Sequence, residues 1–172
     1  MINNILFYNS GGGVGDSIQL LPLLNTLKNK LKNTKFYYLS AHKNHFNSTL
    51  KDFKNEMETI DLDMRYFGFR WWHIFLVKNK IKKKKITKFD LIIDLQSKLR
   101  NSIILKMIPH NYLISQCLNF RLSKPHLNYK KEKKIADTII FSINKLLNEN
   151  FKINDFDIEK IDNKFHFEAK KL

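Results

Sequence analysis

Hydrophobic residues follow two alternating spacings along this chain of 172 residues. Short apolar runs rich in β-branched and aromatic residues predict strands at residues 5–8, 36–39, 89–96 and 112–114, and a further, shorter strand is expected at 58–62. The run FDLIIDLQ at 89–96 is almost continuously apolar, as in strands that are buried on both faces of a parallel sheet. Between these runs the spacing is helical. The alternation therefore predicts an α/β fold with a Rossmann-like parallel sheet flanked by helices.

Four helices are expected between and after the strands. The first helix has leucine on one face, at positions 20, 24, 27 and 31. Pro22 falls near its start, where proline is tolerated, whereas deeper in a helix it would form a kink. The other helices are expected at 44–53, from Leu99 to a stop at Pro109, and within 130–148, where positions 135, 139, 143 and 146 share an apolar face.

The segment 67–88 departs from this alternation. Aromatic residues come first, at positions 67, 69, 71, 72 and 75, and a run of lysines follows at 82–85. Aromatic and lysine side chains together suit a membrane interface with anionic lipids. Alternatively, the aromatic residues belong to the core and the lysines form a solvated face. Both interpretations stay open.

Composition and length limit the organisation of the chain. A sequence of this size with 43% hydrophobic residues forms one domain with a full core, or one half of a two-domain enzyme. We expect a Rossmann-like domain at 1–150. Residues 151–172 are polar and charged, and we interpret them as an interdomain linker or the start of a further domain.

The net charge of +15 favours anionic partners such as nucleic acid, phosphorylated glycans or acidic membranes. It is a weak indicator, because 27 of the 31 basic residues are lysine rather than arginine. Cys117 is the only cysteine, which excludes an internal disulfide and suits a reducing compartment. No secretory signal is apparent, and the apolar run 71–77 is far shorter than a spanning helix needs. We therefore expect a cytoplasmic protein.

The stretch SGGGVGDS, residues 10–17, holds four of the five glycines and follows the first predicted strand. A dinucleotide-binding G-x-G-x-x-G loop requires glycine at position 16, and a P-loop requires lysine there. Asp16 fits neither, because a carboxylate would repel phosphates. At the carboxyl edge of a parallel sheet, Asp16 would instead act as a general base toward a hydroxyl, or it would simply cap the following helix. The residues alone leave both roles open.

The opening SGGGVGDSIQLLPLLNTLKNKL resembles that of glycosyltransferase family 9, the lipopolysaccharide heptosyltransferase family, with Gly15, Asp16 and Pro22 at the matching places. A second match is FDLIIDLQSKLRNS, in which the family pattern falls on Asp94, Leu95, Gln96 and Arg100. The resemblance implies a GT-B fold, of which this chain is the acceptor-side, N-terminal half. A donor-binding C-terminal domain would be missing, so the chain as given is expected to be an incomplete transferase.

The resemblance also implies the reaction and its site. A heptose-like sugar would pass from a nucleotide-sugar donor such as ADP-heptose to a lipopolysaccharide core or related glycolipid acceptor, by direct displacement with inversion. Asp16 would be the catalytic base. The expected substrate-binding residues are Gly12, Gly13, Gly15, Ser17, Gln96 and Arg100. The guanidinium of Arg100 would bind an acceptor phosphate or carboxylate; the alternative is that Asp94 caps the helix and Arg100 is a solvated charge.

Other chemistries have less support in the sequence. His42 and Ser40 follow the second strand, where His42 is more simply a polar loop residue than a base. The histidines lack metal-ligand spacing and Cys117 lacks a cysteine partner, so neither metal nor further cofactor is expected. The rival hypothesis is a basic Rossmann-like module that binds RNA or another polyanion. Few arginines and no RNP-type motif speak against it, so no specific nucleic acid is expected, whereas peripheral contact with the inner membrane stays open.

Overall fold

Five strands form one parallel sheet in the computed structural model, which describes residues 2–11, 13–42, 44–53 and 57–153. The strands are β1 (Asn4–Asn9), β2 (Lys35–Ser40), β3 (Glu58–Ile60), β4 (Phe89–Asp94) and β5 (His110–Ser115). Their order across the sheet is β3-β2-β1-β4-β5, and every neighbouring pair is parallel. The predicted α/β, Rossmann-like fold is confirmed.

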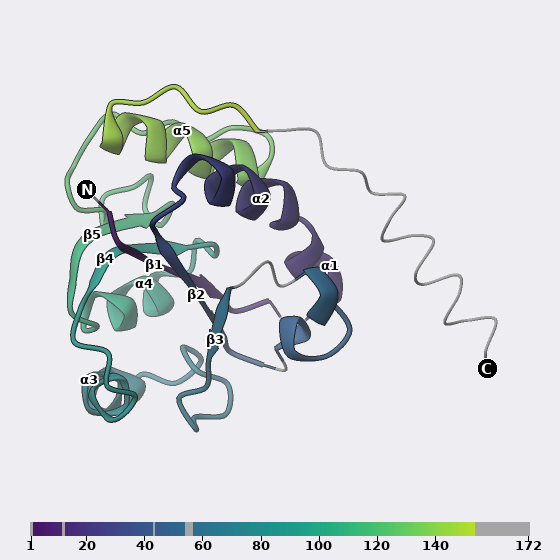
Figure 1. Cartoon of the computed structure of the whole chain (residues 1–172). Coiled ribbons are helices and arrows are strands. Elements are labelled where there is room, and N and C mark those ends of the chain that lie inside the picture. The colour runs from purple at the N-terminus through teal and green to yellow at the C-terminus, as the bar shows by residue number, and fades with distance from the viewer. Residues whose placement is uncertain (1, 12, 43, 54–56, 154–172) are drawn as a thin grey trace.

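Helices cover both faces of the sheet (Figure 1). On one face, α2 (Leu21–Lys30) and α5 (Ile135–Leu147) bury their leucine and isoleucine stripes against Ile5 and Phe7 of β1. On the other, α3 (His73–Lys83) and α4 (Leu99–Lys106) pack against Leu6 and Tyr8. Since successive side chains of a strand point to opposite faces, β1 needs apolar residues throughout, and this is why its run is unbroken.

The central position of β1 creates a switch in the sheet. The chain runs from β1 outward to β2 and β3, then returns to β4 on the other side of β1. The loops that follow β1 and β4 therefore leave the carboxyl edge in opposite directions. Such a topological switch point is where open α/β sheets bind their ligands.

The helix predicted from the leucines at 20–31, with Pro22 near its start, is confirmed as α2, whereas the short helix α1 (Val14–Ile18) before it was not predicted. Pro22 lies in the first turn of α2. Proline has no N–H to continue a helical ladder, and its ring collides with the carbonyl four residues earlier, which here belongs to Ile18, the last residue of α1. The chain changes direction at this break. Helix α1 stays beside the glycine loop, whereas α2 packs on one face of the sheet.

The helix predicted at 44–53 is wrong. Its described residues form two single 3₁₀ turns, His45–Asn47 and Lys51–Phe53. The Asn44 side chain accepts a hydrogen bond from the Phe46 amide at 3.1 Å. Polar residues that bond locally to the backbone compete with a longer helix, which explains the two separate turns.

Two strand ends and one helix also differ from the prediction. The third strand ends at Ile60 instead of residue 62, and β4 ends at Asp94, which leaves Gln96 in the following loop. The segment 67–88 contains α3, which the sequence did not predict as a helix. No helix among the described residues has the length and apolar character needed to cross a membrane.

The predicted linker begins with residues that pack on the domain. The Asn144 side chain exchanges two hydrogen bonds of 2.8 Å with the Phe151 backbone, and Phe151 and Ile153 contact the core. Residues 154–172, which make up most of the predicted linker, lie outside the described residues. The boundary at residue 150 and the role of the segment after it stay predictions.

Candidate functional site

Asn9, the last residue of β1, organises the carboxyl edge of the sheet. Its buried side chain accepts hydrogen bonds from the Gly11 amide at 2.8 Å and from Gln96 Nε2 at 3.2 Å. Its Nδ2 donates to the Tyr38 hydroxyl at 3.0 Å. One side chain thus fixes the start of the glycine loop, the loop after β4 and strand β2. The sequence prediction placed no role on Asn9, because none of these partners is near it in the chain except Gly11.

Asp16 lies in the first turn of α1, and its side chain is exposed. The residue that caps α1 is Gly13, and no side chain makes the capping hydrogen bond, so the simple capping role for Asp16 is wrong. A Cβ atom added to Gly11 would collide with the Asp16 carboxylate, and one added to Gly13 would stand 3.6 Å from its Oδ2 atom. The carboxylate therefore lies directly against the glycine loop.

The other predicted loop residues have different surroundings. A Cβ added to Gly15 would meet no atom within 4 Å, so the space beside Gly15 is open. Ser17 is buried, and its hydroxyl lies 3.2 Å from that of Tyr38. Ser17 therefore supports the turn from inside. Gly12 lies outside the described residues.

Asp94 is almost fully buried at the end of β4. Its Oδ1 accepts from the Gln96 amide at 3.0 Å, and its Oδ2 accepts from the hydroxyls of Ser102 at 2.6 Å and Ser115 at 3.1 Å. Burial raises the pKa of Asp94 to about 7, although these hydrogen bonds oppose the shift. The residue before α4 is Lys98 and no side chain caps that helix, so Asp94 joins β4, α4 and β5 rather than capping.

Arg100, near the start of α4, is anchored by the chain before α3. Its Nε donates to the Gly68 carbonyl at 2.7 Å, and its guanidinium carbon lies 5.8 Å from the centre of the Phe69 ring. Arg100 is half-buried, so it is not the freely solvated charge of the alternative interpretation. Among the described residues its Nη atoms have no hydrogen-bond partner, which leaves them available to an anion.

Gly68 is the residue that makes this anchoring geometry achievable. Its φ angle of 88° is accessible to glycine, and a Cβ there would collide with the Tyr8 hydroxyl. That hydroxyl donates to the Phe67 carbonyl at 2.7 Å, and the Gly68 amide donates to His73 Nδ1 at 3.0 Å. Burial, with the charges of two nearby arginines, lowers the pKa of His73, which keeps Nδ1 able to accept. The only signal in the sequence was a fifth glycine outside the first loop.

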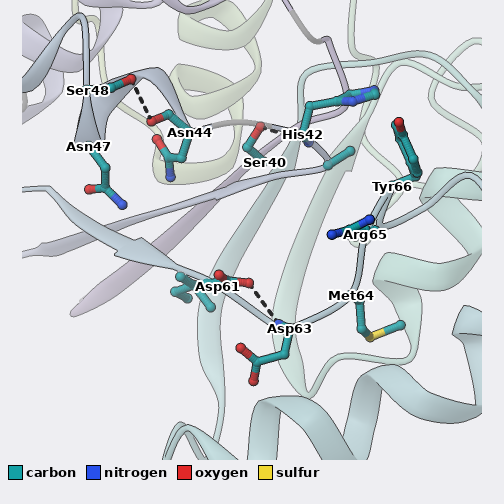
Figure 2. Close-up of a pocket in the computed structure, with 12 residues that line it drawn as sticks. Ser40, His42, Asn44, Asn47, Ser48, Asp61, Asp63, Met64, Arg65 and Tyr66 are labelled. Atoms are coloured by element: carbon teal, nitrogen blue, oxygen red, sulfur yellow. Dashed lines mark hydrogen bonds between the residues drawn. The ribbon is translucent and has the colours of Figure 1, made fainter.

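A pocket of about 820 Å³ opens at the same edge, beside the ends of β2 and β3. Figure 2 shows the amides of Asn44 and Asn47 on one side of it and the carboxylates of Asp61 and Asp63 on the other. Paired donors and acceptors of this kind suit a ligand rich in hydroxyl groups. No group of three His, Cys, Asp or Glu side chains in the described part of the chain is placed to hold a metal ion.

The pocket and the predicted site are neighbours rather than one cavity. Asp16, Gln96 and Arg100 are not among the residues that line the pocket. His42, which lines it, packs edge-on against Tyr66 and Phe69, with ring centres 4.8 and 5.2 Å away. Since Phe69 also lies under Arg100, one aromatic cluster separates the pocket from the arginine.

Comparison of the sequence with models of protein families and with curated proteins finds no match. Solved structures do match. The E. coli heptosyltransferase WaaC with ADP aligns with a TM-score of 0.60 and 13% identity over 90% of this chain and 50% of that chain. For WaaC with ADP-2-deoxy-2-fluoro heptose the values are 0.61, 14%, 90% and 51%.

A glycosyl transferase family 9 structure from Veillonella parvula DSM 2008 aligns with a TM-score of 0.61 and 17% identity, over 99% of this chain and 50% of that chain. The chain thus spans about half the length of the solved structures it matches. The resemblance to glycosyltransferase family 9 expected from the sequence is confirmed at the level of the fold, and the extent of the match is consistent with one half of a GT-B structure.

Proposed function

We propose that this chain is the acceptor-side, N-terminal portion of a glycosyltransferase that moves a heptose-like sugar from a nucleotide-sugar donor to a lipopolysaccharide core or related glycolipid acceptor. The fold match to three glycosyltransferase structures supports the class of enzyme. Two of these structures contain ADP or an ADP-heptose analogue, which supports ADP-heptose as the donor to test first.

The observation that carries the proposal is the position of the Asp16 carboxylate. It is exposed, lies against the glycine loop, and follows the central strand at the switch point of the sheet. A carboxylate in this place can accept the proton of an acceptor hydroxyl as that oxygen attacks the anomeric carbon. A new C–O bond then forms, the bond from that carbon to the donor phosphate breaks, and the nucleoside diphosphate leaves with the electron pair.

The other site residues have supporting roles in this proposal. The Nη atoms of Arg100 bind a phosphate or carboxylate of the acceptor, since Nε is already used to hold the Gly68 carbonyl. Gln96 is held by Asn9 and Asp94, and it faces the same edge as a hydrogen-bonding contact. The open space beside Gly15 lets substrate approach the backbone. No metal or further cofactor enters the proposed step.

The rival function, a module that binds RNA or another polyanion, has less support. Sheet-based RNA recognition uses an open sheet face on which bases stack. Here helices cover both faces of the sheet (Figure 1). The remaining argument for it is the charge of +15. An electrophoretic shift with generic RNA at physiological salt would favour this function over transfer.

The proposed setting is the cytoplasmic face of the inner membrane, where a nucleotide sugar and a lipid-linked acceptor would meet. The proposal is tested with the gene product isolated from its source cells, incubated with ADP-heptose and with lipopolysaccharide that lacks core heptose. Mass spectrometry is expected to show the acceptor gaining one sugar. No gain with this donor or with a panel of other nucleotide sugars would contradict the proposed function.

A further inference from the structure

The start of α3 exposes a group of large apolar side chains. Trp71 is 53% exposed, Trp72 56%, Phe75 79% and Leu76 45%. They lie within six consecutive positions, on the last loop residues and the first turn of the helix. The core does not need them, because α3 packs on the sheet through His73, Val77 and Ile81. We name these four side chains together with Lys78, Lys82 and Lys83 the α3 surface.

The same helix carries a concentration of positive charge. Between Asp63 and Asp90 the sequence has nine lysine or arginine residues and no acidic residue. The lysines of the α3 surface are exposed, and among the described residues none has a carboxylate partner. Lys84, by contrast, lies 3.4 Å from Asp63. The exposed face of α3 therefore changes from aromatic in its first turn to cationic in its last.

We infer that the α3 surface docks on an anionic phospholipid membrane. Aromatic side chains at an interface insert among the lipid headgroups and upper acyl chains, while lysines bind the phosphates. The helix would lie flat against the membrane, with its buried stripe still facing the sheet. The apolar side chains and the lysines of the α3 surface would then both contact the membrane.

Other occupants explain only part of this surface. Nucleic acid would account for the lysines but would leave Phe75 and Leu76 facing water. A second copy of the chain would bring two clusters of like charge together, which opposes association. An anionic membrane binds both parts of the α3 surface, because its acyl chains accept the aromatic side chains and its negative charge complements the lysines.

Docking in this way would bring the candidate site to the lipid surface. The loop that ends in Trp71 and Trp72 contains Gly68, whose carbonyl holds Arg100. The inference goes beyond the proposed function and needs no sugar transfer, so the two proposals fail or succeed separately.

The chain contains only two tryptophans, and both belong to the α3 surface. Their fluorescence therefore reports on this surface directly. With vesicles of phosphatidylcholine containing 30% phosphatidylglycerol at low salt, we expect a blue shift, and quenching when the lipids carry bromine on their acyl chains. Pure phosphatidylcholine vesicles, or 0.5 M salt, are expected to weaken the effect, because charge attracts the protein. No shift at low salt would overturn the inference.

Two variants separate the apolar and cationic parts. Replacing Lys82 and Lys83 by glutamine is expected to lower vesicle affinity about fivefold per lysine. Phe75→Ser with Leu76→Ser is expected to abolish the bromine quenching while the thermal unfolding midpoint stays unchanged, since both side chains are exposed. The matched control replaces Lys30 and Lys32 by glutamine; Lys30 is the last residue of α2, Lys32 follows it, both are exposed, and α2 lies on the other side of the sheet (Figure 1).

The control decides whether binding is specific to the α3 surface. We expect the α2 pair to retain most of its affinity. An equal loss in both lysine pairs would show attraction by net charge alone and would overturn the inference. A fluorescence shift with RNA and none with vesicles would also overturn it and identify nucleic acid as the partner.

Discussion

At the scale of single residues, the site depends on a small number of positions with little space around them. Gly11 has no room for a Cβ because the Asp16 carboxylate lies there, whereas a Cβ on Gly15 would meet no atom within 4 Å. Two glycines of the same glycine-rich stretch, one in the loop and one in α1, thus differ in whether a side chain could be added. The glycine-rich sequence alone could not separate them, since the difference arises from the direction of one side chain.

Gly11→Ala is expected to displace the Asp16 carboxylate and to lower turnover at least tenfold, with little change in stability, because the group that must move is the end of a side chain. Gly15→Ala is expected to stabilise α1 by up to about 1 kcal/mol, since alanine is the better helix former. Thermal unfolding and turnover of both variants check this. A Gly11→Ala protein with full turnover would show that the position of Asp16 is unimportant.

Nε of Arg100 holds the Gly68 carbonyl, and the proposed function assigns anion binding to its Nη atoms. Arg100→Lys keeps the charge but loses this fork geometry. We expect the KM for a phosphorylated acceptor to rise about tenfold in Arg100→Lys and further in Arg100→Gln, with a smaller change in kcat. Steady-state kinetics at varied acceptor concentration measure both constants. An unchanged KM in Arg100→Gln would remove Arg100 from the acceptor site.

At the scale of elements, Asp94 holds β4, α4 and β5 together through a carboxyl group that burial makes hard to ionise. Its pKa is raised to about 7 in the folded state, compared with about 3.9 in an unfolded chain. The folded state therefore binds more protons between these values, and its stability falls as the pH rises through them.

From pH 5 to pH 8 this group is expected to lower the free energy of unfolding by on the order of 2 kcal/mol. Asp94→Asn keeps the shape and removes the titration, so its unfolding free energy should lose this part of the pH dependence. Urea unfolding at several pH values measures both proteins. Parallel pH profiles for the two would contradict the assigned ionisation of Asp94.

Four of the strands were predictable because each contains an apolar run bounded by polar residues; β3, with the sequence ETI, lacks such a run, but all five predicted strands appear in the structure. The predicted helix at 44–53 failed because local side-chain bonds from Asn44 shaped two turns instead. The anchoring of Arg100 by Gly68 spans 32 positions of sequence. Contacts of this range leave no periodic signal, so that part of the site needed the structure.

At the scale of the whole molecule, the strand order places β1 at the centre, and the two motifs that carried the family resemblance meet at its carboxyl edge. Residues 9 and 96 are linked there although 87 positions separate them. The sequence predicted that the two motifs lie close together, because each follows a strand of a predicted parallel sheet and such strands end at the same edge. It did not predict the pocket beside β2 and β3, because the residues of that pocket come from irregular segments.

The proposed function requires a donor-binding half, and the matched structures are about twice the length of this chain. We expect the intact mass of the gene product in its source cells to be near twice 20.6 kDa. Mass spectrometry of the purified product measures this. A mass of 20.6 kDa would mean that sugar transfer needs a donor site from a separate subunit. It would favour the polyanion-binding function over sugar transfer.

The proposed mechanism requires Asp16 to remove the proton from the acceptor hydroxyl. The most direct measurement compares sugar transfer by the gene product with that of its Asp16→Asn variant, which replaces one side-chain oxygen by an NH₂ group. We expect turnover to fall about 10²- to 10⁴-fold, with an unchanged unfolding midpoint because the side chain is exposed. Turnover within twofold of the unmodified protein would contradict it.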